Sequence, residues 1–95
     1  MGSADFIIDA NGKDANAAFK NACDEARHEH GHGGYTGTIA EKTSFKMLDN
    51  GSEEIGEFIE RLLMTEGSPV HDKWGDAGCI KVGEGEFVFF GWASE

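Results

Sequence analysis

The feature that most constrains the fold is a run of apolar side chains near the C-terminal end, EFVFFGWA at residues 86–93. Successive side chains of a strand point to opposite faces of the sheet. Both faces of this strand would be apolar, with Phe87, Phe89 and Gly91 on one face and Val88, Phe90 and Trp92 on the other. Such a strand lies in the centre of a sheet that is covered on both faces, or it forms half of an interface.

Two segments have the periodicity of amphipathic helices. In residues 14–30, Asp14 is a candidate N-cap, Phe19 anchors an otherwise alanine-rich stripe, and Gly31 is the stop signal. In residues 52–66, Ser52 is the candidate N-cap. The apolar stripe of this second helix consists of Ile55, Phe58, Ile59, Leu62 and Leu63.

Strand-like segments account for much of the remaining chain. They are residues 4–9, 36–41, 44–48, 78–82 and 86–93, and we expect the second and third to pair as a hairpin. Gly83-Glu84-Gly85 predicts a second hairpin, between the last two strands. The predicted order is β-α-β-β-α-β-β, which fits one α+β domain spanning residues 1–95. We predict two layers, a mainly antiparallel sheet with both helices on one face, as a ferredoxin-like variant with an added C-terminal strand.

This two-layer arrangement would leave one apolar face of the last strand without cover. Two alternatives remain open. Either the face joins two copies of the chain, or the long connection at residues 65–77 folds over it with Trp74. From the first alternative we predict a homodimer or a higher oligomer.

The charge of the chain restricts its partners. Eight basic and eighteen acidic side chains give a formal net charge of −10 over 95 residues. This balance argues against duplex nucleic acid and anionic membrane surfaces, which bind proteins through Lys and Arg, and it permits a basic partner protein. Because there is neither a membrane-length apolar run nor a secretory leader, we predict a cytoplasmic protein. Cys23 and Cys79 fit small core residues in a reducing compartment.

The most unusual segment is RHEHGHGGYTGTIAEK at residues 27–42. A helix precedes this Gly-rich loop, whereas dinucleotide and phosphate loops open a helix, so the segment is no dinucleotide fingerprint. Its glycines still allow the backbone to approach a ligand, and aromatic rings stack on planar bases. The candidate ligand-binding residues are Arg27, His32, Gly33, Gly34, Tyr35, Thr36, Gly37, Thr38, Lys42 and Trp74. The alternative is a turn that binds nothing, with Tyr35 packed at the edge of the core.

Histidines raise the question of a metal ion. His28, His30 and His32 have a spacing that suits ligands on a strand, but the segment lacks a strand pattern. Metal binding stays open, the alternative being exposed histidines that balance the helix dipole, and no cofactor is predicted. In the long connection, His71 and Asp72 adjoin Trp74, which is either a lid over the core or a recognition residue.

The segments EARHEHGHGGYTGTIAEK (Glu25 to Lys42), DKWGDAGCI (Asp72 to Ile80) and FVFFGWAS (Phe87 to Ser94) resemble a family of small, acidic, uncharacterised proteins encoded by bacteriophages and prophages. The resemblance covers most of the chain from residue 19 onward. The family has no established activity, so the resemblance assigns no catalytic residues. It implies a bacterial host cell and an accessory role, such as inhibiting a host enzyme or binding a nucleotide signal of bacterial immunity.

Three functions are compatible with these observations. The first is a non-catalytic binder that sequesters a small polar ligand, such as a nucleotide immune signal, between residues 31–38 and the Trp74 loop. The second is an acidic interaction module that inhibits a basic or nucleic-acid-binding host protein. Its acidic face would consist of Glu53, Glu54, Glu57 and Glu60. The third is a hydrolase or metal enzyme that uses the histidines and Cys79. It is the weakest of the three, because the spacing assembles no set of nucleophile, base and orienting residue. We predict the first function.

Overall fold

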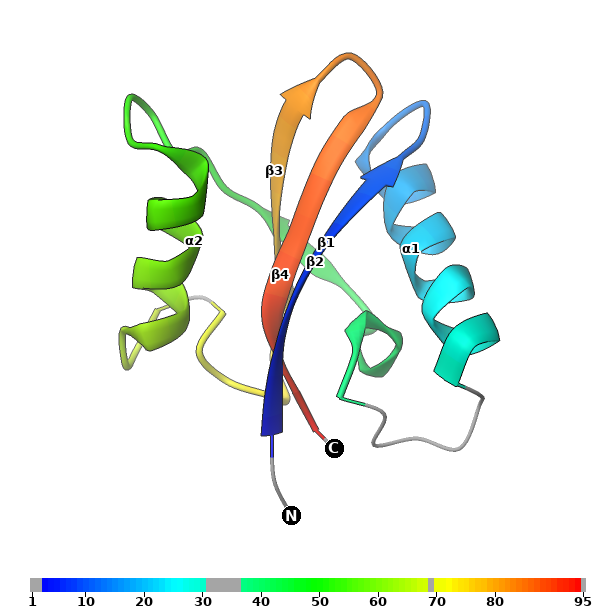
Figure 1. Cartoon of the computed structure of the whole chain (residues 1–95), viewed down its shortest axis with the longest axis horizontal. Helices are drawn as coiled ribbons and strands as arrows, with labels where there is room; N and C mark the ends of the chain where they lie inside the picture. Colours follow the sequence, from blue (N-terminus) through cyan, green and yellow to red (C-terminus); the bar gives the residue numbers. More distant parts are fainter. Residues whose placement is uncertain (1–2, 31–36, 69, 95) are drawn as a thin grey trace.

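The computed structural model describes residues 3–30, 37–68 and 70–94. Two helices and four strands occupy these residues, with one short 3-10 helix between them (Figure 1). In chain order the elements are β1 (Ser3–Asn11), α1 (Ala15–His30), η1 (Ile39–Glu41), β2 (Phe45–Met47), α2 (Ile55–Met64), β3 (Ala77–Gly83) and β4 (Glu86–Ser94). The predicted α+β class is therefore confirmed.

The sheet has the strand order β1-β4-β3-β2. β4 pairs antiparallel with both β1 and β3, whereas β2 pairs parallel with β3. The predicted hairpin between the last two strands is confirmed, and Gly85 in its turn has a positive φ of 69°. The position of β4 between two strands explains why its sequence is apolar on both faces.

The predicted strand at residues 36–41 is wrong in its described part. Ile39–Glu41 forms the 3-10 helix η1, and the Thr38 hydroxyl accepts a hydrogen bond from the Ala40 N–H at 3.2 Å. The side chain of Ile39 is buried among α1 and the sheet. Without the predicted hairpin partner, Phe45–Met47 instead pairs with β3 at the far edge of the sheet.

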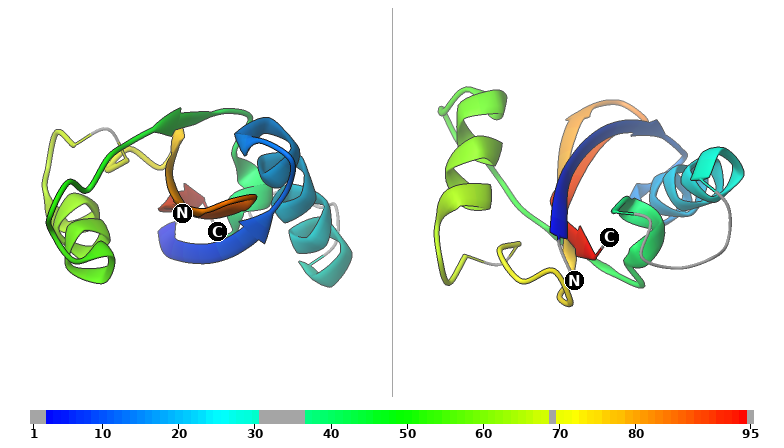
Figure 2. Two further views of the ribbon diagram at one scale, coloured as in Figure 1. Left: turned by 90° about the horizontal axis from the view of Figure 1, so that it is seen from above. Right: turned by 60° about the horizontal axis from the view of Figure 1, so that its bottom comes forward.

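The two helices lie on opposite faces of the sheet, so the prediction that both cover one face is wrong (Figure 1). The two views of Figure 2 show α1 and α2 on either side of a strongly curved sheet, with η1 on the same side as α1. The physical reason is the two-faced apolar pattern of β4, which needs cover on both sides. Since α2 provides the second cover, the exposed face that motivated our oligomer prediction is absent, and the oligomeric state stays a prediction.

The core between α1 and the sheet is built on aromatic rings. The ring of Phe19 from α1 lies 5.1 Å from that of Phe45 and 5.5 Å from that of Phe89, measured between centroids. Phe45 and Phe89 are also 5.5 Å apart, in an edge-to-face arrangement. The alanine stripe of α1 allows the helix to approach the sheet closely, and its three buried members are Ala18, Ala22 and Ala26. The predicted role of Phe19 as the anchor of this helix is confirmed.

The second core lies between α2 and the sheet. Phe58, Ile59 and Leu63 of α2 pack with Val88 and Phe90 of β4. At Gly78 a Cβ atom would lie only 2.6 Å from Cζ of Phe90, so only glycine leaves room for the Phe90 ring at this position. The residues of this cluster are distinct from those of the α1 core, which makes a three-layer arrangement of helix, sheet and helix.

Side-chain caps define where each helix begins. The predicted N-cap of α1 is confirmed, because Asp14 Oδ1 accepts a hydrogen bond from the Ala17 N–H at 2.8 Å. The predicted Ser52 cap of α2 is wrong. Glu54 is the N-cap instead, and its two carboxylate oxygens accept from the N–H groups of Gly56 and Glu57 at 3.0 and 2.9 Å. The longer Glu side chain reaches both donors, so the helix begins at Ile55.

Candidate functional site

A buried lysine organises the loop that precedes β3. The Nζ atom of Lys42 donates hydrogen bonds to three backbone carbonyls, those of Asp72 at 3.4 Å, Lys73 at 3.1 Å and Gly75 at 2.9 Å. Lys42 is only 3% exposed. Burial lowers the pKa of this ammonium group from its ordinary value, while the carboxylates of Asp72 and Asp76 oppose the shift. The three N–H donors of one ammonium thus match three carbonyl acceptors of one loop.

This anchored loop presents Trp74 to solvent. The Trp74 side chain is 68% exposed, which excludes the alternative in which it forms a lid over the core. The Asp72 carboxylate accepts a hydrogen bond from the Trp74 backbone N–H at 2.9 Å and stabilises the turn. Ser44 additionally donates its hydroxyl proton to the carboxylate of Asp76, at the end of the loop. The loop is therefore held at both ends, and its aromatic side chain faces outward.

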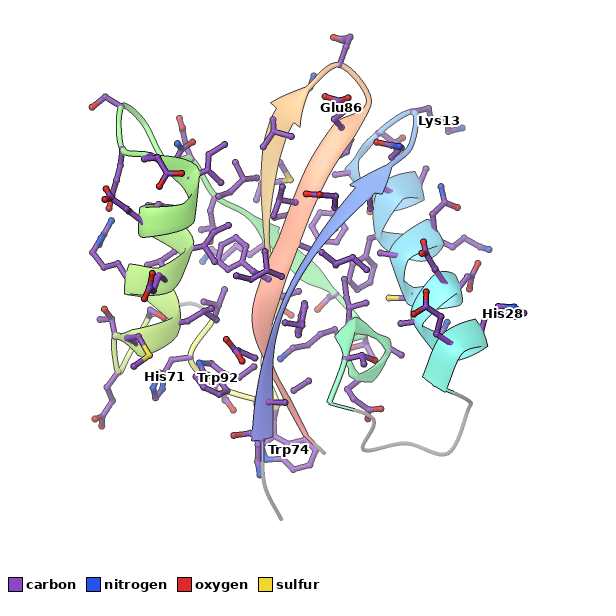
Figure 3. All side chains as sticks on the ribbon, viewed as in Figure 1. Lys13, His28, His71, Trp74, Glu86 and Trp92 are labelled. Atoms are coloured by element: carbon purple, nitrogen blue, oxygen red, sulfur yellow. The ribbon has the colours of Figure 1, made fainter. Side chains whose placement is uncertain are left out.

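A hollow of about 530 Å³ lies beside Trp74. Its lining consists of Ser3, His71, Asp72, Lys73, Trp74 and Trp92. Trp92 is half-buried, and its indole Nε1 donates a hydrogen bond to the Leu63 carbonyl at 2.7 Å, which fixes the ring. Figure 3 shows His71, Trp92 and Trp74 at the same end of the molecule, near the start of β1.

Charges in this hollow are mixed, unlike the acidic chain as a whole. The Lys73 ammonium nitrogen lies 5.3 Å from the centroid of the Trp74 ring, a cation–π contact. His71 is exposed, and the Lys42 ammonium lies behind the loop. The Asp72 carboxylate brings a negative charge to the same hollow, and it accepts a hydrogen bond from the Trp74 backbone N–H. The hollow thus pairs two indole rings with one ammonium, one imidazole and one carboxylate, in a protein of net charge −10.

The ten predicted ligand-binding residues divide into five that the structure does not describe and five that it does. His32, Gly33, Gly34, Tyr35 and Thr36 lie outside the described residues, so the predicted Tyr35–Trp74 pocket stays a prediction.

Among the described candidates, Arg27 lies on α1 and contacts Asp24 at 3.4 Å. Gly37 and Thr38 line a different groove, beside β1. Lys42 links its own segment to the Trp74 loop, but through backbone carbonyls and from a buried position. Sequence reasoning placed His71 and Lys73 in the candidate loop around Trp74 without choosing them as ligand contacts, and it missed Ser3 and Trp92 as lining residues. The position of His71 and Lys73 beside Trp74 was the available signal for those two.

The described part of the chain shows neither a cluster of metal-binding side chains nor an accessible cysteine nucleophile. There, no group of three or more His, Cys, Asp or Glu side chains is arranged to hold a metal ion. His28 on α1 and His71 lie on opposite sides of the molecule (Figure 3), and the side chain of His30 is among those not described. Cys23 and Cys79 are both buried, and burial raises the pKa of each thiol. A thiol of raised pKa that is shielded from solvent is a poor nucleophile.

The stability of the protein should therefore fall in alkaline solution. Burial raises the pKa of the Cys79 thiol from 9.0 to about 11, so the folded chain holds a proton that the unfolded chain releases. Stability from this group is complete below pH 9 and is lost as the pH rises toward 11, by about 3 kcal/mol. Urea unfolding of the wild type and of Cys79→Ala, at a series of pH values, measures this slope. Equal slopes in the two proteins would contradict the assignment.

The acidic face predicted on the second helix is largely engaged in contacts of its own. The Glu53 carboxylate accepts two hydrogen bonds from Arg61, at 2.8 and 3.2 Å, and the Glu54 carboxylate caps α2. The hydrogen bonds from Arg61 lower the pKa of Glu53. Of these four glutamates, Glu57 and Glu60 are exposed, and their carboxylates make no hydrogen bond or ion pair with another described residue. The helix is therefore a weak candidate for docking a basic partner.

No family model matches this chain, and no match was found among curated proteins or solved structures. The resemblance to bacteriophage proteins consequently stays a prediction, as does the cytoplasmic location. Within the described residues, neither helix is long and apolar enough to cross a membrane.

Proposed function

We propose that this protein is a non-catalytic binder of a small polar ligand that carries a planar ring, with nucleotides as the ligand class. The observation that carries the proposal is the 68% exposed Trp74 side chain on a loop anchored by Lys42. An indole exposed to this extent is unusual, because loop aromatics normally bury much of their area. Ligand sites combine aromatic walls with a few polar groups, which matches the hollow at Trp74 and Trp92.

The lining suggests how such a ligand would be held. A planar base would stack on the Trp74 indole, and the Asp72 turn and the Lys42 anchor hold the backbone that carries this ring. His71 and Lys73 would meet an anionic group such as a phosphate.

Replacing Trp74 by alanine should weaken nucleotide binding without unfolding the protein. Stacking on an aromatic side chain contributes about 1–3 kcal/mol per base, so we expect a loss of about 5- to 150-fold. Stability should change by less than about 0.5 kcal/mol, because the side chain is mostly exposed. Calorimetric titration with adenosine and guanosine monophosphate measures the affinity, and urea unfolding measures the stability.

Controls separate stacking from other effects. Trp74→Phe keeps an aromatic face and should retain most of the affinity, and Met64→Ala, a change at a similarly exposed residue on α2, should have no effect. Ribose 5-phosphate, which lacks the ring, should bind more weakly than either nucleotide. Absence of nucleotide binding at about 1 mM, or full binding by Trp74→Ala, would reject the proposal.

A further inference from the structure

β1 is an edge strand that is as long as the central strand. It spans nine residues, as β4 does, and pairs only with β4 in the sheet order β1-β4-β3-β2. In Figure 1 it runs across the front of the molecule. Proteins usually shorten or cover such edges, because the unpaired N–H and C=O groups are a template for another strand.

The register identifies which backbone groups point outward. The Gly12 N–H donates to the Gly85 carbonyl at 3.1 Å and so continues the β1–β4 register one pair beyond Asn11 and Glu86. Hydrogen-bonded and non-hydrogen-bonded pairs alternate along an antiparallel ladder. Even-numbered residues of β1 therefore bond to β4, and odd-numbered residues direct their backbone groups outward.

A side-chain contact agrees with this assignment. The outward carbonyl of Asn11 accepts a hydrogen bond from Nδ2 of Asn21 on α1 at 2.9 Å. Across the described residues, no group bonds to the outward N–H and C=O groups of Asp5, Ile7 and Asp9. These three residues form the open edge.

A groove of about 380 Å³ runs along the open edge, between β1 and the facing sides of α1 and η1. Its apolar part includes Phe6, Ile8 and Ala26, while Glu25 and Glu29 of α1 line it with exposed carboxylates. On the other face of β1, the side chains of Asp5 and Asp9 are exposed, and Ile7 between them is 57% exposed. Both sides of an added strand would therefore meet acidic groups.

We propose that the open edge takes up an extended, basic segment of a partner protein as a fifth strand of the sheet. Its backbone would pair with the outward groups of Asp5, Ile7 and Asp9. Directly opposed side chains on one face of a strand pair interact, so the segment carries Lys or Arg opposite each Asp and an apolar residue opposite Ile7. The recognised pattern is basic–apolar–basic at alternate positions. The intervening side chains of the segment enter the groove near Glu25 and Glu29.

A second copy of this chain is a poor occupant of the same edge. Antiparallel pairing of two β1 strands about Ile7 places Asp5 of each copy opposite Asp9 of the other, and like charges in this position are destabilising. Each copy also carries a net charge of −10, which opposes self-association. The same carboxylates repel nucleic acid. The charge of the edge thus selects a basic polypeptide.

A designed peptide tests the proposal. The probe is an acetylated nine-residue peptide of threonine, with lysine at the third and seventh positions and valine at the fifth. Its control carries glutamate in place of both lysines. We expect the lysine peptide to bind about 10-fold more tightly or better, because two attractive cross-strand pairs become repulsive in the control. In the Asp5→Lys/Asp9→Lys variant the preference should reverse.

Two substitutions at Ile7 test the backbone pairing itself. Ile7→Pro removes an outward N–H and obstructs the edge while sparing the bonds to β4, and it should weaken peptide binding by at least about 10-fold. Ile7→Thr keeps the N–H and should bind within about 3-fold of the wild type. Should the proline variant fail to fold, hydrogen exchange of the edge amides in the wild-type protein with bound peptide tests the backbone pairing independently.

Hydrogen exchange locates the bound peptide. The amides of Asp5, Ile7 and Asp9 should exchange rapidly in the unbound protein and slow down when the lysine peptide binds. Trp74→Ala should not change peptide binding, which separates this inference from the nucleotide site. The proposal is overturned if the lysine peptide does not bind at about 1 mM, if both peptides bind equally, or if the slowed amides lie elsewhere. A dimer of the protein that Ile7→Pro abolishes would also overturn it.

Discussion

Phe89→Ala should lower the free energy of unfolding by about 3–5 kcal/mol, the usual cost of removing a fully buried aromatic ring. Phe89 is 0% exposed and packs against both Phe19 of α1 and Phe45 of β2. Its loss opens a cavity where helix, central strand and edge strand meet. A domain of this size is stable by roughly 5–15 kcal/mol, so the variant retains only part of that margin. Urea unfolding followed by circular dichroism measures the change.

Two comparison variants calibrate this result. Phe89→Leu keeps most of the volume and should cost less than the alanine change, which keeps the measurement possible if Phe89→Ala does not fold. Ile7→Ala, at a side chain that is 57% exposed, should change stability by less than about 0.5 kcal/mol. A loss below about 1 kcal/mol for Phe89→Ala would show that this ring is not the centre of the α1 core.

Lys42→Met should destabilise the protein by about 2–4 kcal/mol and release the Trp74 loop, because three carbonyls lose their common donor. Methionine keeps an unbranched chain of similar length but donates no hydrogen bond. The loss should appear in urea unfolding and as faster amide exchange in residues 72–75, with weaker nucleotide binding as a consequence. The bonds concerned are those from Nζ to the carbonyls of Asp72, Lys73 and Gly75.

Lys46→Met is the matched control for this change. Lys46 is an exposed lysine on β2, four residues further along the chain, and its replacement should leave both stability and the loop unchanged. Wild-type stability together with unchanged loop exchange in Lys42→Met would show that the ammonium does not anchor the loop. A loss of stability without faster loop exchange would show a core role alone.

The local elements of this fold were largely predictable because their signals lie within a few residues. The spacing of alanines around Phe19 predicted α1, and the Asp14 carboxylate satisfies a donor only three residues away. Glycines at positions 83 and 85 predicted the β3–β4 hairpin, and the alternation of Phe and Val predicted two apolar faces on β4. Each of these features depends on the period of one element or on the conformational freedom of one turn.

The candidate site was less predictable, because its parts meet only through contacts distant in the sequence. Trp74 was predicted as a ligand contact from its place in a long, charged loop. Trp92 was placed on the apolar face of the last strand that needed cover, and Lys42 was predicted to contact a ligand. Nothing within residues 27–42 indicates that the Lys42 side chain is buried under a loop thirty residues away.

By itself, the sequence determined that the protein has two amphipathic helices and a central strand that must be covered on both faces. Which element supplies the second cover was decided only by the tertiary structure, where α2 packs against Val88 and Phe90. The structure also placed β2 parallel to β3 and left the outer edge of β1 open among the described strands. The physical reason is that periodicity specifies which side of an element is apolar. The choice of partner for that side depends on chain connections and on packing between residues far apart in sequence.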